Sequence, residues 1–207
     1  MRFDFAQLRA VLLPEPAGLA GYSEDWPDGE ALIPAAVLFP IVERATGHTV
    51  LLTQRNPHLR DHPGQISFPG GRIEALDPSP LHAALREAEE EVGLSSDCVV
   101  PLGYLPEYRT GTGFQVTPVV GLVRPPFEAR LDPFEVAEVF EVPLSFLLDP
   151  ANHKRHALYY RGAMREFYAM PYGDYFIWGA TAGMIRLLYE RLLSSSVGCE
   201  PQGGVLA

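Results

Sequence analysis

The stretch that decides the fold is residues 64–94, which read GQISFPGGRIEALDPSPLHAALREAEEEVGL. It starts as a short apolar strand that ends at Phe68, and the strand breaks at Pro69, Gly70 and Gly71. A loop leads from this break to a segment whose apolar residues recur with the period of a helix. The stretch therefore predicts a strand, a loop and a helix, in that order.

Both ends of the expected helix carry recognisable capping residues. Ser79 and Pro80 suit the N-cap and the first helical position, and Gly93 suits the C-terminal cap. Between them, one stripe of apolar residues should be buried because its members repeat about every 3.6 residues. The stripe consists of Leu81, Ala84, Leu85, Ala88 and Val92.

A separate face of the same helix carries Glu87, Glu90 and Glu91 at positions i, i+3 and i+4. Like charges at this spacing repel each other by roughly 0.2–0.5 kcal/mol per pair. One interpretation is a solvated face, which is the usual state of acidic clusters on helices. The alternative is that a divalent cation offsets the repulsion.

The context of the helix favours the second interpretation. The strand, the glycine pair, the loop and the run from Arg86 to Leu94 resemble the Nudix box, G-x5-E-x7-R-E-U-x-E-E-x-G-U, where U is aliphatic. From Arg86 onward the match is complete. In the loop, Gly71 lies fifteen residues before Arg86 where the pattern requires fourteen, and the acid is Asp77 instead of Glu. We interpret this as a one-residue insertion, and it leaves the loop acid without an assigned role.

The resemblance implies an α/β fold, a Nudix-like α/β/α sandwich with a mixed central sheet on which the box helix packs. It also implies a hydrolase that cleaves a phosphoanhydride in a nucleoside diphosphate linked to another moiety. Mg²⁺ or Mn²⁺ would be the cofactor, since carboxylates on one rigid face are hard oxygen ligands, and it would activate the water that attacks phosphorus. Glu87 and Glu91 are the strongest ligand candidates, followed by Glu90.

Other box residues have supporting roles by the same resemblance. Arg86 is expected to hold the acidic side chains in place, although an ordinary surface ion pair with Glu90 is the simpler alternative. Gly70 and Gly71 would let the backbone approach the helix and a bound phosphate closely. Relatives usually draw a further acid from outside the box, as a ligand or general base. We prefer Glu135 for this role over the neighbouring Glu138 and over a weaker option, Glu107, although each also suits a solvated strand edge.

The substrate is indicated by residues 51–71, which run into the box. They resemble the signature of the coenzyme A pyrophosphatase branch, L-L-T-x-R-[SA]-x3-R-x3-G-x3-F-P-G-G, with Asn56 in place of Ser or Ala. Residues 113–121 and 177–182 also resemble that branch. The positions in register are Leu51, Leu52, Thr53, Arg55, Arg60, Gly64, Phe68, Pro69, Gly70 and Gly71.

This resemblance implies hydrolysis of coenzyme A, or its acyl or oxidised forms, to 3′,5′-ADP and 4′-phosphopantetheine. Arg55 and Arg60 would supply forked, permanently charged donors to the phosphates, unless both are merely solvated loop residues. A rival hypothesis is the same chemistry on another nucleotide, such as ADP-ribose or a nucleoside triphosphate. A third is a Nudix-fold module that senses a nucleotide without cleaving it, although such modules typically lose the box carboxylates.

Composition limits the remaining possibilities. The 207 residues are 47% hydrophobic and carry a net charge of −10, which argues against nucleic acid as a partner. Cys98 and Cys199 have no metal-type spacing and are expected to be free thiols. With no signal sequence and no apolar run of 18 residues, we expect a cytoplasmic protein without a membrane partner.

We expect one domain over residues 1–207, with a mixed sheet covered by helices on both faces. A helix over about 2–13 precedes an irregular connection over 14–31, the core spans about 31–193, and the tail from 194 to 207 is expected to be mobile. The further elements expected are strands at 31–42, 49–53, 99–107, 115–123 and 135–142, a short helix at 143–148, a hairpin of 156–160 with 166–172, and a helix at 175–193.

Overall fold

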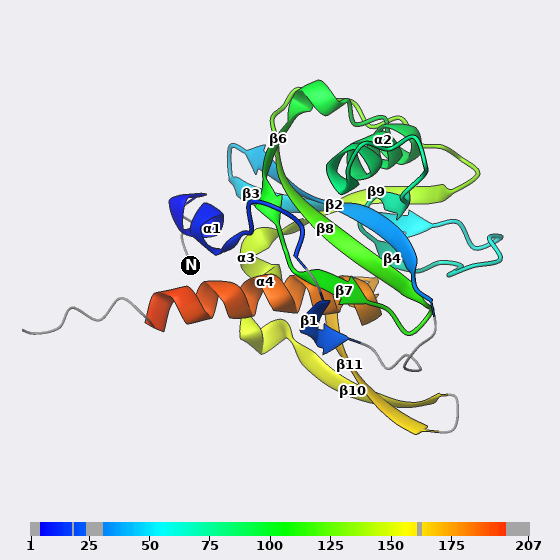
Figure 1. The fold of residues 1–207 in the computed structure, drawn as a ribbon, viewed down its shortest axis with the longest axis vertical. Helices are drawn as coiled ribbons and strands as arrows, with labels where there is room; N and C mark the ends of the chain where they lie inside the picture. The colour runs from blue at the N-terminus through cyan, green and yellow to red at the C-terminus, as the bar shows by residue number, and fades with distance from the viewer. Residues whose placement is uncertain (1–4, 18, 24–30, 161–162, 198–207) are drawn as a thin grey trace, which may run out of the picture.

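The structure is a computed structural model that describes residues 5–17, 19–23, 31–160 and 163–197 (Figure 1). A mixed sheet forms its centre, with one long helix on each face. The described helices are α1 (Phe5–Val11), α2 (Pro80–Val92), α3 (Leu144–Leu147) and α4 (Gly179–Val197), with 3-10 turns at Ser96–Cys98 and Pro150–Asn152. The strands of the large sheet are β1 (Leu19–Ser23), β2 (Ile33–Arg44), β3 (Gly47–Arg55), β4 (Ile66–Ser67), β5 (Gly70–Arg72), β6 (Val99–Tyr104), β7 (Glu107–Arg109), β8 (Phe114–Val123) and β9 (Val136–Pro143).

The central strand β2 divides at its middle, and this division positions the box. Its second half, from Ile41 to Arg44, pairs with β3, whereas its first half, from Ala35 to Val37, pairs with β5. The far end of β3 pairs instead with β4, through Thr53 and Gln54. The strands β2 and β3 therefore separate, and the segment from β4 to β5 fills the opening with the two glycines of the box.

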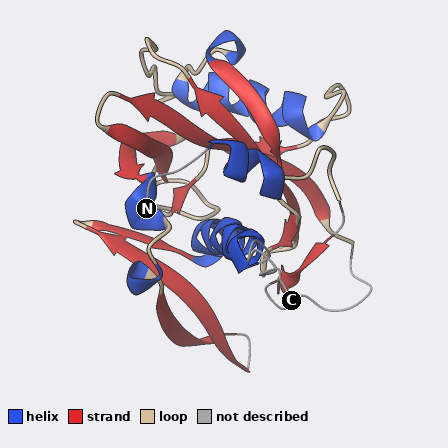
Figure 2. Cartoon of the chain, turned by 90° about the vertical axis from the view of Figure 1, so that its left-hand side faces the viewer, coloured by secondary structure: helices blue, strands red, loops and turns tan. Residues whose placement is uncertain are grey.

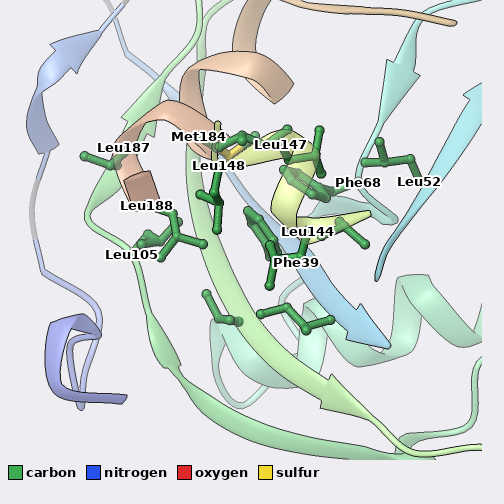
Figure 3. Packing of buried hydrophobic residues seen from close by; sticks show 14 of the residues in the cluster. Phe39, Leu52, Phe68, Leu105, Leu144, Leu147, Leu148, Met184, Leu187 and Leu188 are labelled. Carbon is green, nitrogen blue, oxygen red and sulfur yellow. The ribbon is translucent and has the colours of Figure 1, made fainter. Parts of the chain in front are cut away.

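Each face of the sheet has its own hydrophobic core. On one face α2 packs against the apolar side of β2, and its buried contacts include Ala84, Ala88 and Leu38. On the other face α4 covers a larger cluster, and Figure 3 shows Met184 and Leu188 of α4 gathered with Phe39 in that cluster. The prediction of an α/β fold with a mixed sheet and helices on both faces is confirmed.

A second sheet extends the molecule beyond α4. It consists of β10 (Lys154–Tyr160), β11 (Ala163–Tyr172) and β12 (Tyr175–Trp178), all antiparallel. Figure 2 shows α4 close to end-on, with the large sheet on one side and this sheet on the other. The long hairpin of β10 and β11 confirms the pairing expected for residues 156–172, and its turn lies outside the described residues.

Several element predictions are correct, including the hairpin of β2 with β3, the strand β8 and the short helix α3. The C-terminal helix begins later than expected, because residues 175–178 form a strand in which Trp178 pairs with Ala169. It then continues to Val197, so Ser194 is helical and does not begin the tail; residues 198–207 lie outside the described part.

The other differences are local. The connection expected over 14–31 contains β1, which pairs in parallel with β7. The strand expected over 99–107 is divided into β6 and β7, and the break expected at the two box glycines is the strand β5. The helix α1 lies within the range expected for it, although residues 2–4 fall outside the described ranges, as does Cys199. None of the described helices is long and apolar enough to cross a membrane.

Candidate functional site

The box helix α2 begins and ends where its capping residues predict. The Ser79 side chain accepts a hydrogen bond from the backbone N–H of His82, and Pro80 follows at the first position. At the other end Gly93 has a φ of 69°, and its N–H donates to the carbonyl of Glu89 at 2.9 Å. Gly93 therefore ends the helix in a left-handed conformation, as the sequence predicts.

The buried face of α2 differs slightly from the expected stripe. Ala84, Ala88 and Val92 are fully buried as predicted, whereas Leu81 and Leu85 are only half-buried. The helix is rotated so that Glu91 enters the interior, where it is 4% exposed. The acidic face is therefore not a uniformly solvated one.

Two groups near the opening between β2 and β3 contact the carboxylate of Glu91. Its Oε2 accepts a hydrogen bond from the backbone N–H of Gly70 at 3.1 Å, and its Oε1 lies 3.6 Å from Nη1 of Arg55. The pKa of Glu91 is raised to about 8, chiefly by burial and also by the charges of Glu87 and Glu135, against the lowering effects of Gly70 and Arg55. A buried carboxyl in this state would be stabilised as the anion by additional positive charge.

Glu87 is packed against the second glycine of the box. A Cβ placed on Gly71 would lie 2.4 Å from Oε1 of Glu87 and 2.7 Å from its Oε2. The pKa of Glu87 is raised, first by burial and then by the charges of Glu90 and Glu135, while Arg86 lowers it. Gly71 is thus needed for the space that it leaves to this carboxylate.

Arg86 joins the helix acids to the loop. Its Nη1 donates to Glu87 at 2.9 Å and to the more exposed Glu90 at 3.0 Å. Its Nε and Nη2 donate to the two carboxylate oxygens of Asp77 at 3.1 and 2.9 Å, and its Nη2 also reaches the carbonyl of Arg72. The pKa of Asp77 is lowered, chiefly by this pairing.

The loop acid is therefore part of the site, contrary to what the broken spacing indicated. The spacing from Gly71 to Asp77 matches the box, so the extra residue lies between Asp77 and Arg86. The N–H of Asp77 closes a turn on the carbonyl of Glu74, and the carboxylate of Asp77 still reaches Arg86 despite the extra residue between them. The preserved first half of the spacing was the signal that could have kept Asp77 in the site.

The three candidates for the outside acid occupy different places. Glu135 lies close enough for its charge to raise the pKa of both Glu87 and Glu91. Glu138 accepts a hydrogen bond from the hydroxyl of Tyr175 at 2.6 Å. Glu107 accepts hydrogen bonds from two side chains of β8, those of Gln115 and Thr117. Only Glu135 of the three is coupled to the helix carboxylates, and its role there stays a prediction.

The two arginines of the upstream signature are also separated. Arg55 stands beside Glu91, and its Nε is buried without a hydrogen-bond partner. Arg60 is exposed in the loop between β3 and β4. Asn56, the position that departs from the signature, contacts the turn before β9. Its side-chain Nδ2 donates to the carbonyl of Pro133 at 2.8 Å. Its backbone N–H donates to the carbonyl of Glu135, also at 2.8 Å.

The carboxylates of the described chain are not gathered around a metal position. Within the described ranges, no three His, Cys, Asp or Glu side chains are grouped so that they could hold an ion. Glu87 is turned toward Arg86, and Glu91 toward Gly70 and Arg55. The donor set still suits a divalent cation, because it offers hard oxygens whose ionised forms are disfavoured by burial and by each other's charge.

Comparison with known proteins agrees with this geometry. The NUDIX domain family model matches residues 32–164. NudL of Escherichia coli (strain K12), described as an uncharacterized Nudix hydrolase, is 47% identical over 154 residues, which are 74% of this chain and 80% of NudL. NudL of Citrobacter koseri shows the same identity and coverage.

Solved structures show the same fold at low identity. A binary complex of the Caenorhabditis elegans Ap4A hydrolase superposes with a TM-score of 0.52 at 18% identity, covering 79% of this chain and 98% of that chain. The Nudix hydrolase RenU of Mycobacterium smegmatis superposes with a TM-score of 0.51 at 18% identity, covering 84% and 92%. With the family model and the sequence relatives, these findings show that the chain belongs to the Nudix family and is a Nudix hydrolase.

Proposed function

We propose that this Nudix hydrolase cleaves the phosphoanhydride of coenzyme A, or of its acyl or oxidised forms, to 3′,5′-ADP and 4′-phosphopantetheine. One observation carries the proposal: Arg55, a fixed position of the coenzyme A signature, lies 3.6 Å from Glu91, a carboxylate of the box. The motif that indicates the substrate and the motif that indicates the reaction thus meet at a single pair of side chains.

The acidic and the basic residues of the site would have different roles. Glu87 and Glu91, with Glu90 and Glu135 nearby, would hold the divalent cation that Nudix hydrolases generally use. When bound, Mg²⁺ or Mn²⁺ would polarise the phosphoryl oxygens and lower the pKa of the attacking water. Arg55 has a buried Nε without a partner and would donate to a phosphate oxygen, and the exposed Arg60 would approach the same group from the loop.

Two groups of the site act on other residues and not on the substrate. Arg86, fixed at one end by Asp77, keeps Glu87 and Glu90 pointing in one direction. The N–H of Gly70 keeps Glu91 at the mouth of the opening between β2 and β3. We also propose that the protein works in the cytoplasm, and that it acts on small nucleotides, because a net charge of −10 is unfavourable for binding nucleic acid.

ADP-ribose is one rival substrate. The Nudix domain of Shewanella oneidensis NrtR, solved with ADP-ribose, superposes on this chain with a TM-score of 0.50 at 18% identity. A module that only senses a nucleotide is less well supported, since Glu87, Glu90 and Glu91 are all retained.

A substrate panel tests the proposal. The full chain is incubated with Mg²⁺ or Mn²⁺ and coenzyme A, acetyl-coenzyme A, ADP-ribose or a nucleoside triphosphate, and the products are separated by chromatography. We expect 3′,5′-ADP and 4′-phosphopantetheine from coenzyme A, and no activity from the Glu91→Gln variant. Intact coenzyme A beside rapid cleavage of ADP-ribose would refute the substrate assignment. Full activity of Glu91→Gln would refute the assignment of the box carboxylate.

A further inference from the structure

A cleft of about 500 Å³ lies at the end of β3, within the size range of small-molecule sites. Residues of β3, β4, β9 and β12 line it, together with the turn before β12. The residues used below are Gln54, Glu138, Asp174, Tyr175 and Trp178.

The cleft opens on the face of the sheet opposite the box helix. Gln54 of β3 and Glu138 of β9 are neighbours in the sheet. The hydroxyl of Tyr175 donates to Glu138 at 2.6 Å, and its ring stacks on Phe140 with centroids 3.6 Å apart. Because Phe140 belongs to the core on the α4 face, this wall belongs to that face as well.

Two of the strands that line the cleft, β3 and β9, carry or adjoin residues of the candidate active site. Arg55 directly follows Gln54 on β3. Glu135 lies in the turn just before β9, three residues before Glu138. Gln54 and Arg55 are the last two residues of β3, so a substrate with its phosphates at Arg55 would pass around this end of the strand to place another group in the cleft on the opposite face.

Charge determines which group of a substrate fits there. The cleft is lined by two carboxylates, Glu138 and Asp174, in a chain that is already strongly acidic. A phosphate would be repelled, whereas a neutral group with N–H donors would be bound by charge-assisted hydrogen bonds. The aromatic residues Tyr175 and Trp178 add partly apolar surface for a carbon chain.

We propose that this cleft binds the pantetheine arm of the substrate, a neutral chain with two amide groups. Its amide N–H groups donate to Glu138 or Asp174, and Gln54 pairs with an amide carbonyl, while the phosphates remain at Arg55. The inference rests on the proposed cleavage of coenzyme A, and it adds the site at which the pantetheine part of the substrate binds.

Product inhibition of coenzyme A hydrolysis separates the two ends of the substrate. In Glu138→Gln and Asp174→Asn we expect the inhibition constant of 4′-phosphopantetheine to rise about tenfold, as loss of a hydrogen bond to a charged group predicts. The inhibition constant of 3′,5′-ADP should not change. Glu43→Gln, which removes an exposed carboxylate at the opposite end of β2, serves as the matched control and should alter neither constant.

Unchanged constants for 4′-phosphopantetheine in both variants, or a rise confined to 3′,5′-ADP, would overturn the assignment of the cleft. If the wild-type chain does not cleave coenzyme A, the proposed function has failed and the cleft is tested alone. Calorimetric titration with pantetheine, which has no phosphate, then decides. Binding that weakens about tenfold in Asp174→Asn supports the cleft, and no binding to the wild-type chain overturns it.

Discussion

Replacing Gly71 with alanine should lower kcat about 100-fold while leaving the fold intact. The new Cβ would lie 2.4 Å from Oε1 of Glu87, where ordinary contact begins at 3.4 Å. The carboxylate would therefore have to move by about 1 Å, and a displacement of that size at a reacting centre costs on the order of 100-fold in rate. The atoms to be displaced are the carboxylate at the end of a flexible side chain and not backbone atoms, so their movement should cost little stability.

The neighbouring glycine provides the comparison. A Cβ on Gly70 would lie 2.4 Å from the carbonyl oxygen of Ala36 and 2.6 Å from the Cα of Val37, both in the backbone of β2. Gly70 also has a φ of 156°, a backbone angle that residues with a side chain rarely adopt. The backbone of β2 cannot move aside, so Gly70→Ala should lower the free energy of unfolding by about 1–3 kcal/mol or more. Each kcal/mol lost corresponds to a decrease of about 2–4 °C in Tm.

The assay is steady-state hydrolysis of the best substrate together with thermal unfolding of each variant. We expect Gly71→Ala to lower kcat about 100-fold with a nearly unchanged Tm. Adding Glu87→Gln to Gly71→Ala should lower kcat little further, because both changes act on the same carboxylate. A Gly71→Ala enzyme with kcat near the wild-type value, or one as unstable as Gly70→Ala, would refute this account of the contact.

Three other predictions follow from the charges of the site. Asp77→Asn should lower kcat about 10–100-fold without unfolding the protein, since it loosens Arg86 and not the core, and kcat with Tm checks this. In cation-free protein, the pKa of Glu91 is about 8, above its value of about 4.3 in the unfolded chain. The contribution of protonated Glu91 to the free energy of unfolding is therefore full below about pH 4 and is lost as the pH rises through 8. Thermal unfolding in chelator from pH 4 to 9 should show this decrease, and Glu91→Gln should flatten it. Asn56→Ala removes the bond to the carbonyl of Pro133 and should reduce kcat less than Asp77→Asn does, which the same rate assay measures.

The parts of the fold that depend on local chemistry could be predicted from the sequence. Ser79, Pro80 and Gly93 set the ends of α2 because capping needs only neighbouring backbone groups. The start of α4 could not be found in this way. The apolar residues of 175–178 fit a helical period, but the pairing of Trp178 with Ala169 places them in a sheet. Such pairing depends on a distant strand, and local spacing does not contain it.

The candidate site shows the same division. The helical period placed Glu87, Glu90 and Glu91 on one helix, but it did not distinguish the buried Glu91 from the more exposed Glu90. That difference comes from the rotation of α2 on the sheet. Asp77 was missed because counting along the chain treats an inserted residue as a break, whereas a folded loop absorbs it and keeps the contact with Arg86.

The larger core has a practical consequence for anyone who isolates this enzyme. The family match ends at residue 164, yet the cluster on the α4 face includes Met170, Ile177, Met184, Ile185 and Leu188. The hydroxyl of Thr181 also donates to the carbonyl of Ile66, in the strand just before the box glycines. A chain trimmed to residues 32–164 would leave one side of the sheet open to water and the box loop without this support. Recombinant work should therefore keep everything through the end of α4 at Val197.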